Sequence, residues 1–215
     1  MKALSCDSSS IIALSENCLL WLLDKFDAEF WIPPYVKKEI MDNPITTKKY
    51  GFEAMRNGLI IGNVIKVVET NERLRDKIIN VGNRLLRAEG RFLRIIHCGE
   101  ADALALAIEK GLKGILVDEK NTRLMIENPE ALRRIVEKRI GKRVEINWEA
   151  VREIQRMTKG LRIIRSAEIV TIAVKRGILN WPYSKKELLK NALYALKFSG
   201  CAITEKEIIE LVNSL

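Results

Sequence analysis

Short apolar runs alternate along the chain with longer segments of helical periodicity. The apolar runs predict strands at residues 2–6, 30–32, 63–69, 114–117 and 161–164. The helical pattern predicts helices at residues 11–23, 35–41, 71–94, 100–110 and 166–176, and two more within 185–215. Such alternation is typical of a parallel sheet that is covered by helices on both faces. The sequence therefore predicts a three-layer α/β/α sandwich with a mostly parallel central sheet.

One stretch interrupts this alternation. Residues 124–160 are rich in charge and predict a helical, basic insertion, and residues 185–215 form C-terminal helices. No internal repeat and no low-complexity linker divides the chain. We therefore expect a single domain over residues 1–215 with this insertion inside it.

Composition narrows the chemistry that this fold could carry. The 215 residues are 47% hydrophobic, enough for a full core, and no apolar run reaches the ~18 residues of a membrane span. Without a secretory signal pattern, a cytoplasmic protein is expected. His97 is the one histidine, and the four cysteines are scattered. A metal site would therefore use carboxylates, which favour a hard ion such as Mg²⁺ or Mn²⁺.

The net charge of +9 is unevenly placed. Residues 121–165 hold twelve Lys or Arg against six acids, and residues 71–97 hold seven against three. Two basic segments on a nearly neutral remainder fit a surface that binds a polyanion. They fit equally well the solvated faces of ordinary charged helices.

Acidic residues recur where the predicted strands end or the next helices begin. They are Asp7, Glu39, Glu100, Asp102, Asp118 and Glu119. Ligands of an open parallel sheet bind beyond the carboxyl ends of its strands, so these groups are expected at one edge. Gathered carboxylates repel each other unless a divalent cation neutralises them. Each residue alone also has a structural interpretation, as a helix cap or a first-turn acid.

The segments that carry these acids resemble the PIN-domain family. Four stand in the family's order: CDSS at 6–9, IPPYVKKE at 32–39, GEADA at 99–103 and VDEKNTR at 117–123. The pattern is most similar to the prokaryotic branch related to VapC-type toxins, which residues 166–179 and 200–212 also resemble. Residues 41–96 and 124–160 contain no segment of this kind.

The resemblance implies a metal-dependent ribonuclease whose acids ligate one or two Mg²⁺ or Mn²⁺ ions. Position by position, the family's acidic set falls on Asp7, Glu39, Asp102 and Asp118, which are expected to converge in one pocket. Glu100 and Glu119 are further candidate ligands, and Ser9 and Asn121 candidate supporting groups. Glu100 and Asp102 point about 200° apart on a helix, so one of them faces the ion. Asp102 is preferred on its match, with Glu100 as the alternative.

Basic residues outside the acidic pocket would hold the RNA backbone. The candidates are Lys120, Arg123, Arg133, Arg134, Lys138 and Arg139. Trp31 and Tyr35 could stack on a base, although aromatic side chains more often pack in a core. The expected partner is RNA, with no membrane; a toxin-type protein would also have an antitoxin-like protein partner, and a homodimer is a further candidate.

Three functions compete at this point. The first is a metal-dependent endoribonuclease of the PIN type, either toxin-like or engaged in RNA processing. The second is an RNA-binding or scaffold protein that keeps the fold without catalysis. The third, a nucleotide-binding domain, is disfavoured because the chain has neither a G-x-G-x-x-G nor a G-x-x-x-x-G-K-[ST] loop.

Overall fold

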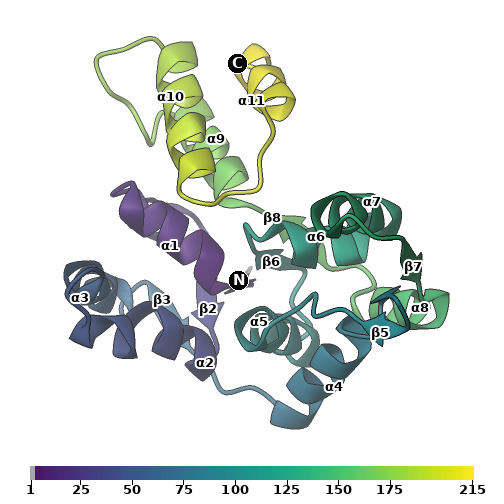
Figure 1. Cartoon of the computed structure of the whole chain (residues 1–215). Coiled ribbons are helices and arrows are strands. Elements are labelled where there is room, and N and C mark those ends of the chain that lie inside the picture. The colour runs from purple at the N-terminus through teal and green to yellow at the C-terminus, as the bar shows by residue number, and fades with distance from the viewer. Residues whose placement is uncertain (1–2) are drawn as a thin grey trace.

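A parallel five-stranded sheet lies at the centre of the computed structural model, which describes residues 3–215 (Figure 1). The strand order is β3-β2-β1-β6-β8, with every neighbouring pair parallel. The strands are β1 (Ala3–Cys6), β2 (Glu29–Ile32), β3 (Ile65–Val67), β6 (Gly114–Leu116) and β8 (Arg162–Ile164). All five predicted strands are present, with ends shifted by a few residues; residue 2 lies outside the described part of the chain. The predicted parallel sheet is confirmed.

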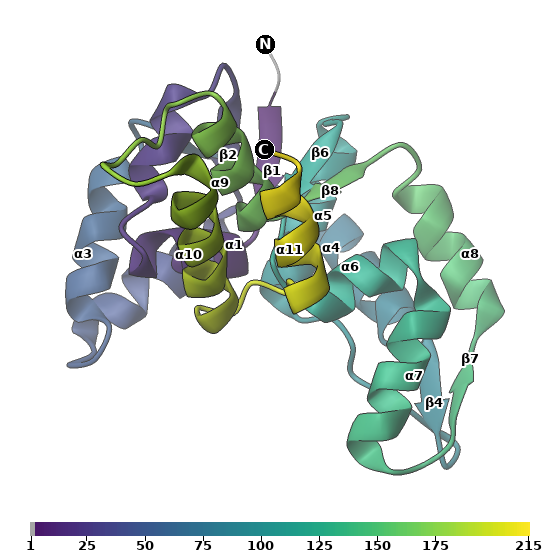
Figure 2. The same ribbon diagram turned by 90° about the horizontal axis from the view of Figure 1, so that it is seen from above.

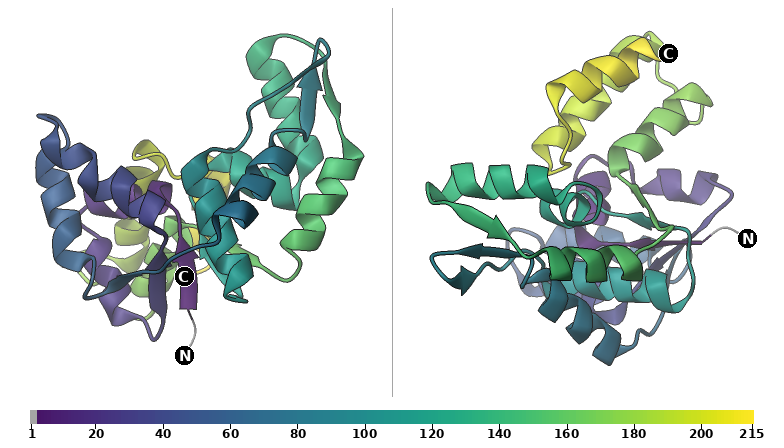
Figure 3. Two further views of the ribbon diagram at one scale, coloured as in Figure 1. Left: turned by 90° about the horizontal axis from the view of Figure 1, so that it is seen from below. Right: turned by 90° about the vertical axis from the view of Figure 1, so that its right-hand side faces the viewer.

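Helices cover both faces of this sheet, as the right-hand view of Figure 3 shows. On one face, Cys6 and Leu116 pack with buried side chains of α1, α9, α10 and α11. On the other face, Ile115 packs with α4, α5 and the elements that follow β6. The helices named here are α1 (Ser8–Glu16), α4 (Glu72–Gly82), α5 (Cys98–Glu109), α9 (Ser166–Lys175), α10 (Lys185–Phe198) and α11 (Glu205–Asn213). The molecule is therefore the predicted α/β/α sandwich.

Side-chain caps set the start of several of these helices. The Asn71 side chain accepts hydrogen bonds from the first turn of α4, and Ser184 and Thr204 form capping boxes at α10 and α11. Such caps satisfy amide groups that have no partner within the helix. Short polar residues therefore mark these boundaries in the sequence.

The segment after β2 is more broken than its pattern predicts. The expected helix at 35–41 is α2 (Pro34–Lys37) followed by a π-helical turn (Lys38–Asp42), and α3 (Gly51–Ile60) was not predicted. Likewise, the helix expected at 11–23 ends at Glu16, and a 3₁₀ turn (Leu20–Lys25) follows. Cys18 between them has a φ of 56°, a left-handed conformation that ends a helix.

The long basic helix expected at 71–94 is wrong in its second half. After α4, the chain forms a hairpin of β4 (Leu86–Ala88) and β5 (Arg91–Phe92). The two turn residues, Glu89 and Gly90, have φ angles of 49° and 78°, as a two-residue hairpin turn requires. Gly90 is therefore part of a hairpin turn, where the sequence pattern predicted a helix.

The charged stretch 124–160 is mainly helical, as predicted, with one strand inside it. It contains the second half of α6 (Lys120–Glu127), then α7 (Pro129–Ile140), β7 (Val144–Ile146) and α8 (Trp148–Met157). Strand β7 pairs antiparallel with β4, which closes a second sheet of order β5-β4-β7. Figure 2 shows this sheet and α7 at the end of the molecule opposite α3.

The insertion shares a core with the hairpin. Leu132, Val144 and Ile154 of the insertion are buried in one cluster with Ile78 of α4 and Leu86 of β4. Apolar residues at helical and strand spacing thus fold the insertion onto the α4–α5 face of the sheet. No helix in the described residues is long and apolar enough to span a membrane.

Candidate active site at the carboxyl edge of the sheet

Asp7 lies where β1 ends and α1 begins. Its Oδ2 accepts hydrogen bonds from the Ser9 amide (3.1 Å) and from Ser9 Oγ (2.6 Å), and its own amide donates to the Leu116 carbonyl of β6 (2.9 Å). The residue is 1% exposed, and burial raises the pKa of its carboxyl group. Asp7 is therefore a buried and oriented carboxylate between two neighbouring strand ends.

Glu39 reaches the same region from the π-helical turn. Its carboxylate packs against Gly99 at the start of α5, so closely that a Cβ atom on residue 99 would collide with it. Burial raises the pKa of Glu39, and the charges of Asp7 and Asp102 raise it further, whereas a hydrogen bond from Ser8 lowers it. A glycine is thus needed at position 99 for this close approach.

Glu100 is in the first turn of α5, where its Oε2 accepts a hydrogen bond from the His97 amide (2.6 Å). Burial first, and then the charges of Asp7, Glu119 and Glu39, raise its pKa to about 7. Such an increase means that too few cations or hydrogen-bond donors stabilise the charged form of Glu100. The Glu100 carboxylate therefore faces other acids.

Glu119 completes this group from the start of α6. Its Oε2 accepts a hydrogen bond from the Thr122 amide (2.8 Å) and caps the helix. Burial and the charge of Asp7 raise its pKa, whereas Arg139 of α7 lowers it. We name Asp7, Glu39, Glu100 and Glu119 the carboxylate cluster, because the charge of Asp7 raises the pKa of each of the other three.

Asp102 lies on another side of α5. Its Oδ1 accepts a hydrogen bond from Thr70 Oγ1 (2.6 Å), and Arg75 of α4 is the cation that lowers its pKa against the effect of burial. The charge of Asp7 raises the pKa of Glu100, and the charge of Asp102 raises that of Glu39. Both acids of α5 therefore act on the cluster, and the preference for Asp102 as the ion ligand stays a prediction.

Asp118 is held by the start of α9. Its Oδ1 and Oδ2 accept hydrogen bonds from the Ser166 amide (2.7 Å) and from Ser166 Oγ. Its amide donates to Ser9 Oγ (3.0 Å), so Ser9 joins the Asp7 and Asp118 loops. The convergence of the four expected acids on one ion stays a prediction.

The donor chemistry of the cluster fits a hard divalent cation. All four side chains are carboxylates, and mutual repulsion contributes to the raised pKa of three of them. Across residues 3–215, however, no three His, Cys, Asp or Glu side chains are gathered closely enough to hold an ion. The sheet edge thus carries the donor type that a hard cation prefers, but the donors are too far apart to coordinate one ion in this conformation.

The predicted RNA-binding cations fall into two groups. Arg123 lies 3.9 Å from both Glu127 and Glu207, and Arg133 forms ion pairs with Glu130 (3.1 Å) and Glu137 (2.6 Å). These two side chains are therefore held by acids of the protein, and their contact with RNA stays a prediction. The remaining candidates are exposed: Lys120, Arg134, Lys138 and Arg139.

The two aromatic candidates, Trp31 and Tyr35, differ in their position relative to the cluster. Trp31 donates from Nε1 to Glu29 (2.8 Å) within β2, whereas Tyr35 is 37% exposed and lies beside Cys98 and Glu39, which raise its pKa. Tyr35 is therefore at the rim of the cluster and Trp31 is not. Arg75, which approaches Asp102, was not among the predicted site residues, because its basic helix was interpreted only as a whole, as a polyanion-binding surface or a solvated face.

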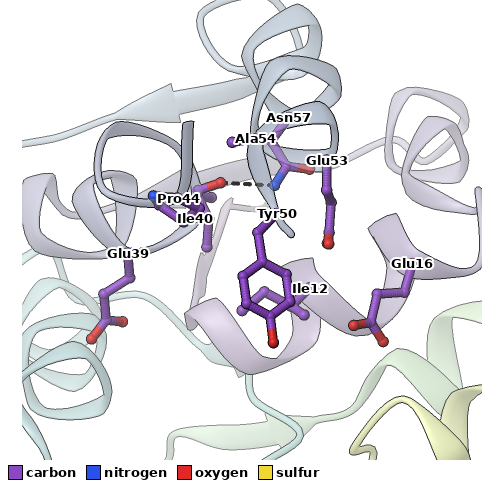
Figure 4. Close-up of a pocket in the computed structure, with 9 residues that line it drawn as sticks. All are labelled: Ile12, Glu16, Glu39, Ile40, Pro44, Tyr50, Glu53, Ala54 and Asn57. Atoms are coloured by element: carbon purple, nitrogen blue, oxygen red, sulfur yellow. Dashed lines mark hydrogen bonds between the residues drawn. The ribbon is translucent and has the colours of Figure 1, made fainter. Parts of the chain in front are cut away.

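A hollow of about 320 Å³ opens beside the cluster (Figure 4). Glu39 lies at one end, Glu16 and Glu53 at the other, and Tyr50 points between them from the loop before α3. Apolar side chains of α1 and the π-helical turn form part of its walls. Because its ends are acidic, this hollow repels anionic groups such as phosphate.

Comparison with known proteins agrees with this architecture. A family model described as PIN domain matches residues 4–130, more than half of the chain. No match was found among curated proteins or among solved structures. The matched region contains β1, β2, β6 and every member of the carboxylate cluster, and PIN domains in general have a nuclease-type fold. The chain therefore belongs to the PIN-domain family.

Proposed function

We propose that this protein is a metal-dependent endoribonuclease. The observation that carries the proposal is the gathering of Glu100 with Asp7, Glu119 and Glu39 at the carboxyl edge of the sheet, where burial first and then these three charges raise its pKa to about 7. Perturbed carboxyl groups gathered at such an edge are typical of catalytic sites. Asp7, Glu39 and Glu100 would hold Mg²⁺ or Mn²⁺, with Glu119 beside them.

Each of these side chains has a support that sets its direction. Ser9 orients Asp7, the His97 amide orients Glu100, and the missing side chain of Gly99 lets Glu39 approach. A bound hard ion would supply a water molecule of lowered pKa and stabilise charge on the phosphate. Because Glu100 is half protonated near pH 7, cation binding must displace its proton, and apparent affinity should rise with pH.

In this proposal, the exposed cations of α6 and α7 bind the substrate backbone. Arg139 is close enough to lower the pKa of Glu119, so the end of α7 borders the cluster. Lys120, Arg134 and Lys138 are exposed on the same two helices. Each phosphate contact on a single strand contributes about 0.7 to the slope of log affinity against log salt. An Arg134→Ala/Lys138→Ala/Arg139→Ala variant should therefore flatten that slope by up to about 2.

A non-catalytic RNA-binding or scaffold role is the second candidate. It is favoured by the absence of three closely gathered metal-binding side chains among the described residues. A toxin-type role, with an antitoxin-like protein partner, and an RNA-processing role are both compatible with the catalytic proposal. Cleavage itself separates the catalytic from the non-catalytic function.

The decisive experiment measures cleavage of structured and unstructured RNA in Mg²⁺, Mn²⁺ or EDTA. Glu100→Gln should abolish the metal-dependent cleavage, because the amide removes one charge from the cluster while keeping the hydrogen bond to His97. Asp102→Asn, two residues along the same helix, is the matched control and should retain most activity. Equal loss in both variants would contradict the assignment of Glu100. No metal-dependent cleavage by the wild type would support the scaffold role.

A further inference from the structure

The loop between α9 and α10 exposes two large aromatic rings at the end of the helix pair (upper left in Figure 1). Trp181 is 55% exposed and Tyr183 is 66% exposed. Pro182 separates them, and the Tyr183 amide donates to the Trp181 carbonyl (2.7 Å), which closes a tight turn. Exposed aromatic pairs on a constrained turn indicate a binding surface, because isolated loops seldom leave so much apolar area in water.

The two rings border a hollow of about 250 Å³, which is also lined by Leu188 and Asn191 of α10. Leu188 is almost fully buried, whereas Asn191 is exposed. Two aromatic faces offer stacking, and the amide of Asn191 offers both a donor and an acceptor. Stacking plus an amide edge is the chemistry that recognises an unpaired nucleobase. The hollow is below the ~300–1,000 Å³ of sites for whole drug-sized molecules.

Five cations surround this loop along the chain and on the adjoining helix ends. They are Lys175, Arg176, Lys185, Lys186 and Lys190, all exposed. The Lys185 ammonium lies 3.4 Å from the Lys175 carbonyl, so the end of α9 and the start of α10 are in contact. Glu187 is the one acid in the stretch, and it is used in the Ser184 capping box (2.6 Å to Ser184 Oγ).

The positive charge of this region is not neutralised by the protein. None of the five cations forms an ion pair within residues 3–215, whereas Arg133 of the basic insertion forms two. Unpaired cations next to exposed rings match the two parts of a single-stranded nucleic acid, its phosphates and its unstacked bases. The hollow and the Asn191 amide favour a single-stranded nucleic acid over a membrane surface. A membrane contact requires rings that protrude from the surface and does not use a hydrogen-bonding amide.

We propose that Trp181, Tyr183, Asn191 and these five cations, named the C-terminal patch, bind single-stranded RNA. The patch lies outside the family match and at the end of α9 opposite Ser166, which is about 15 Å along that ten-residue helix. The choice of RNA among polyanions rests on the proposed function. The acidic cluster repels phosphate, so a separate basic surface at the other end of α9 would bind the strand. Binding at the patch does not require cleavage.

The test measures binding of a labelled, unstructured 20-nucleotide RNA in EDTA, where no metal-dependent cleavage occurs. Trp181→Ala/Tyr183→Ala should weaken binding about tenfold or more, from the loss of base stacking. Phe52→Ala, which removes an aromatic ring that is 76% exposed on α3, is the matched control and should leave affinity within twofold. Lys185→Ala/Lys186→Ala/Lys190→Ala should flatten the salt slope by about 2. Melting temperatures of the variants show that each is folded.

Each result decides for or against the patch. Wild-type affinity in Trp181→Ala/Tyr183→Ala, or no RNA binding by the wild type, overturns it. Binding to phosphatidylserine vesicles that both patch variants lose, with RNA affinity unchanged, also overturns it and indicates a membrane surface. If the variants lose RNA binding while the wild type shows no cleavage, the patch stands and the nuclease proposal fails. If the wild type cleaves RNA and the aromatic variant binds normally, the nuclease stands and the patch fails.

Discussion

Replacing Glu100 by Gln removes one charge from the carboxylate cluster at nearly constant volume. In the folded protein the pKa of Glu100 is raised from 4.5 to about 7. Between these values the folded carboxyl group keeps a proton that the unfolded chain has released. The folded state therefore binds more protons, and the free energy of unfolding falls as pH rises from 4.5 to 7.

The size of this effect follows from the same two pKa values. One pH unit corresponds to about 1.4 kcal/mol, so the charge of Glu100 costs the metal-free fold about 3 kcal/mol above pH 7. The amide oxygen of glutamine can still accept the hydrogen bond from the His97 amide. Glu100→Gln should accordingly be more stable than wild type by about 3 kcal/mol at pH 8, roughly 6–12 °C in Tm for a chain of this length.

The assay is urea unfolding between pH 4 and 9 in EDTA, with the difference between variant and wild type plotted against pH. Glu109→Gln, on the same helix, is the control: the pKa of Glu109 is lowered by Lys110, so its removal cannot give this gain. A divalent ion should then reverse the order at about one thousand times its Kd, where an ion bound only by the folded wild type adds about 4.1 kcal/mol and so exceeds the gain of about 3 kcal/mol. Parallel pH profiles for Glu100→Gln and wild type would refute the reasoning.

Three further changes test other parts of the description. Asp118→Ala should lower the free energy of unfolding by about 1–3 kcal/mol for each Ser166 donor left without an acceptor, whereas Asp118→Asn should stay close to wild type in urea unfolding. Gly99→Ala should displace the Glu39 carboxylate and reduce Mn²⁺ affinity measured by calorimetry; unchanged affinity would place Glu39 outside the ion site. Arg133→Ala should leave the salt dependence of RNA binding unchanged, because acids of its own helix hold its guanidinium; a flatter slope would contradict this.

The sheet and its edge could be predicted from the sequence because their signals are local. Short β-branched runs and the polar residues after them identify all five strands and place Asp7 at the end of β1. The segments around Asp7, Glu39 and Glu100 identify the PIN family without any knowledge of packing. A parallel sheet then brings the strand ends together wherever the helices lie.

Long-range pairing was decided only by the tertiary structure. Residues 86–88 sit within a helical pattern, yet they pair with residues 144–146 far along the chain and become β4 and β7. No local window contains both partners, so propensity favoured a helix where packing stabilises a sheet. The charged composition of the insertion likewise hid the apolar face that folds it onto the core.

The direction of each functional side chain was also determined by the tertiary structure. Helical geometry shows that Glu100 and Asp102 face different ways. The docking of α5, held by Ser5 Oγ donating to the Ala103 carbonyl (2.8 Å), then determines that Glu100 lies among Asp7, Glu119 and Glu39 while Asp102 contacts Thr70. The same holds for charge: Arg133 and Lys190 both appear in the sequence as helical cations, and only their surroundings show that, among the described residues, Arg133 is ion-paired and Lys190 is not. A sequence specifies which groups are present, whereas packing determines which of them still lack a partner.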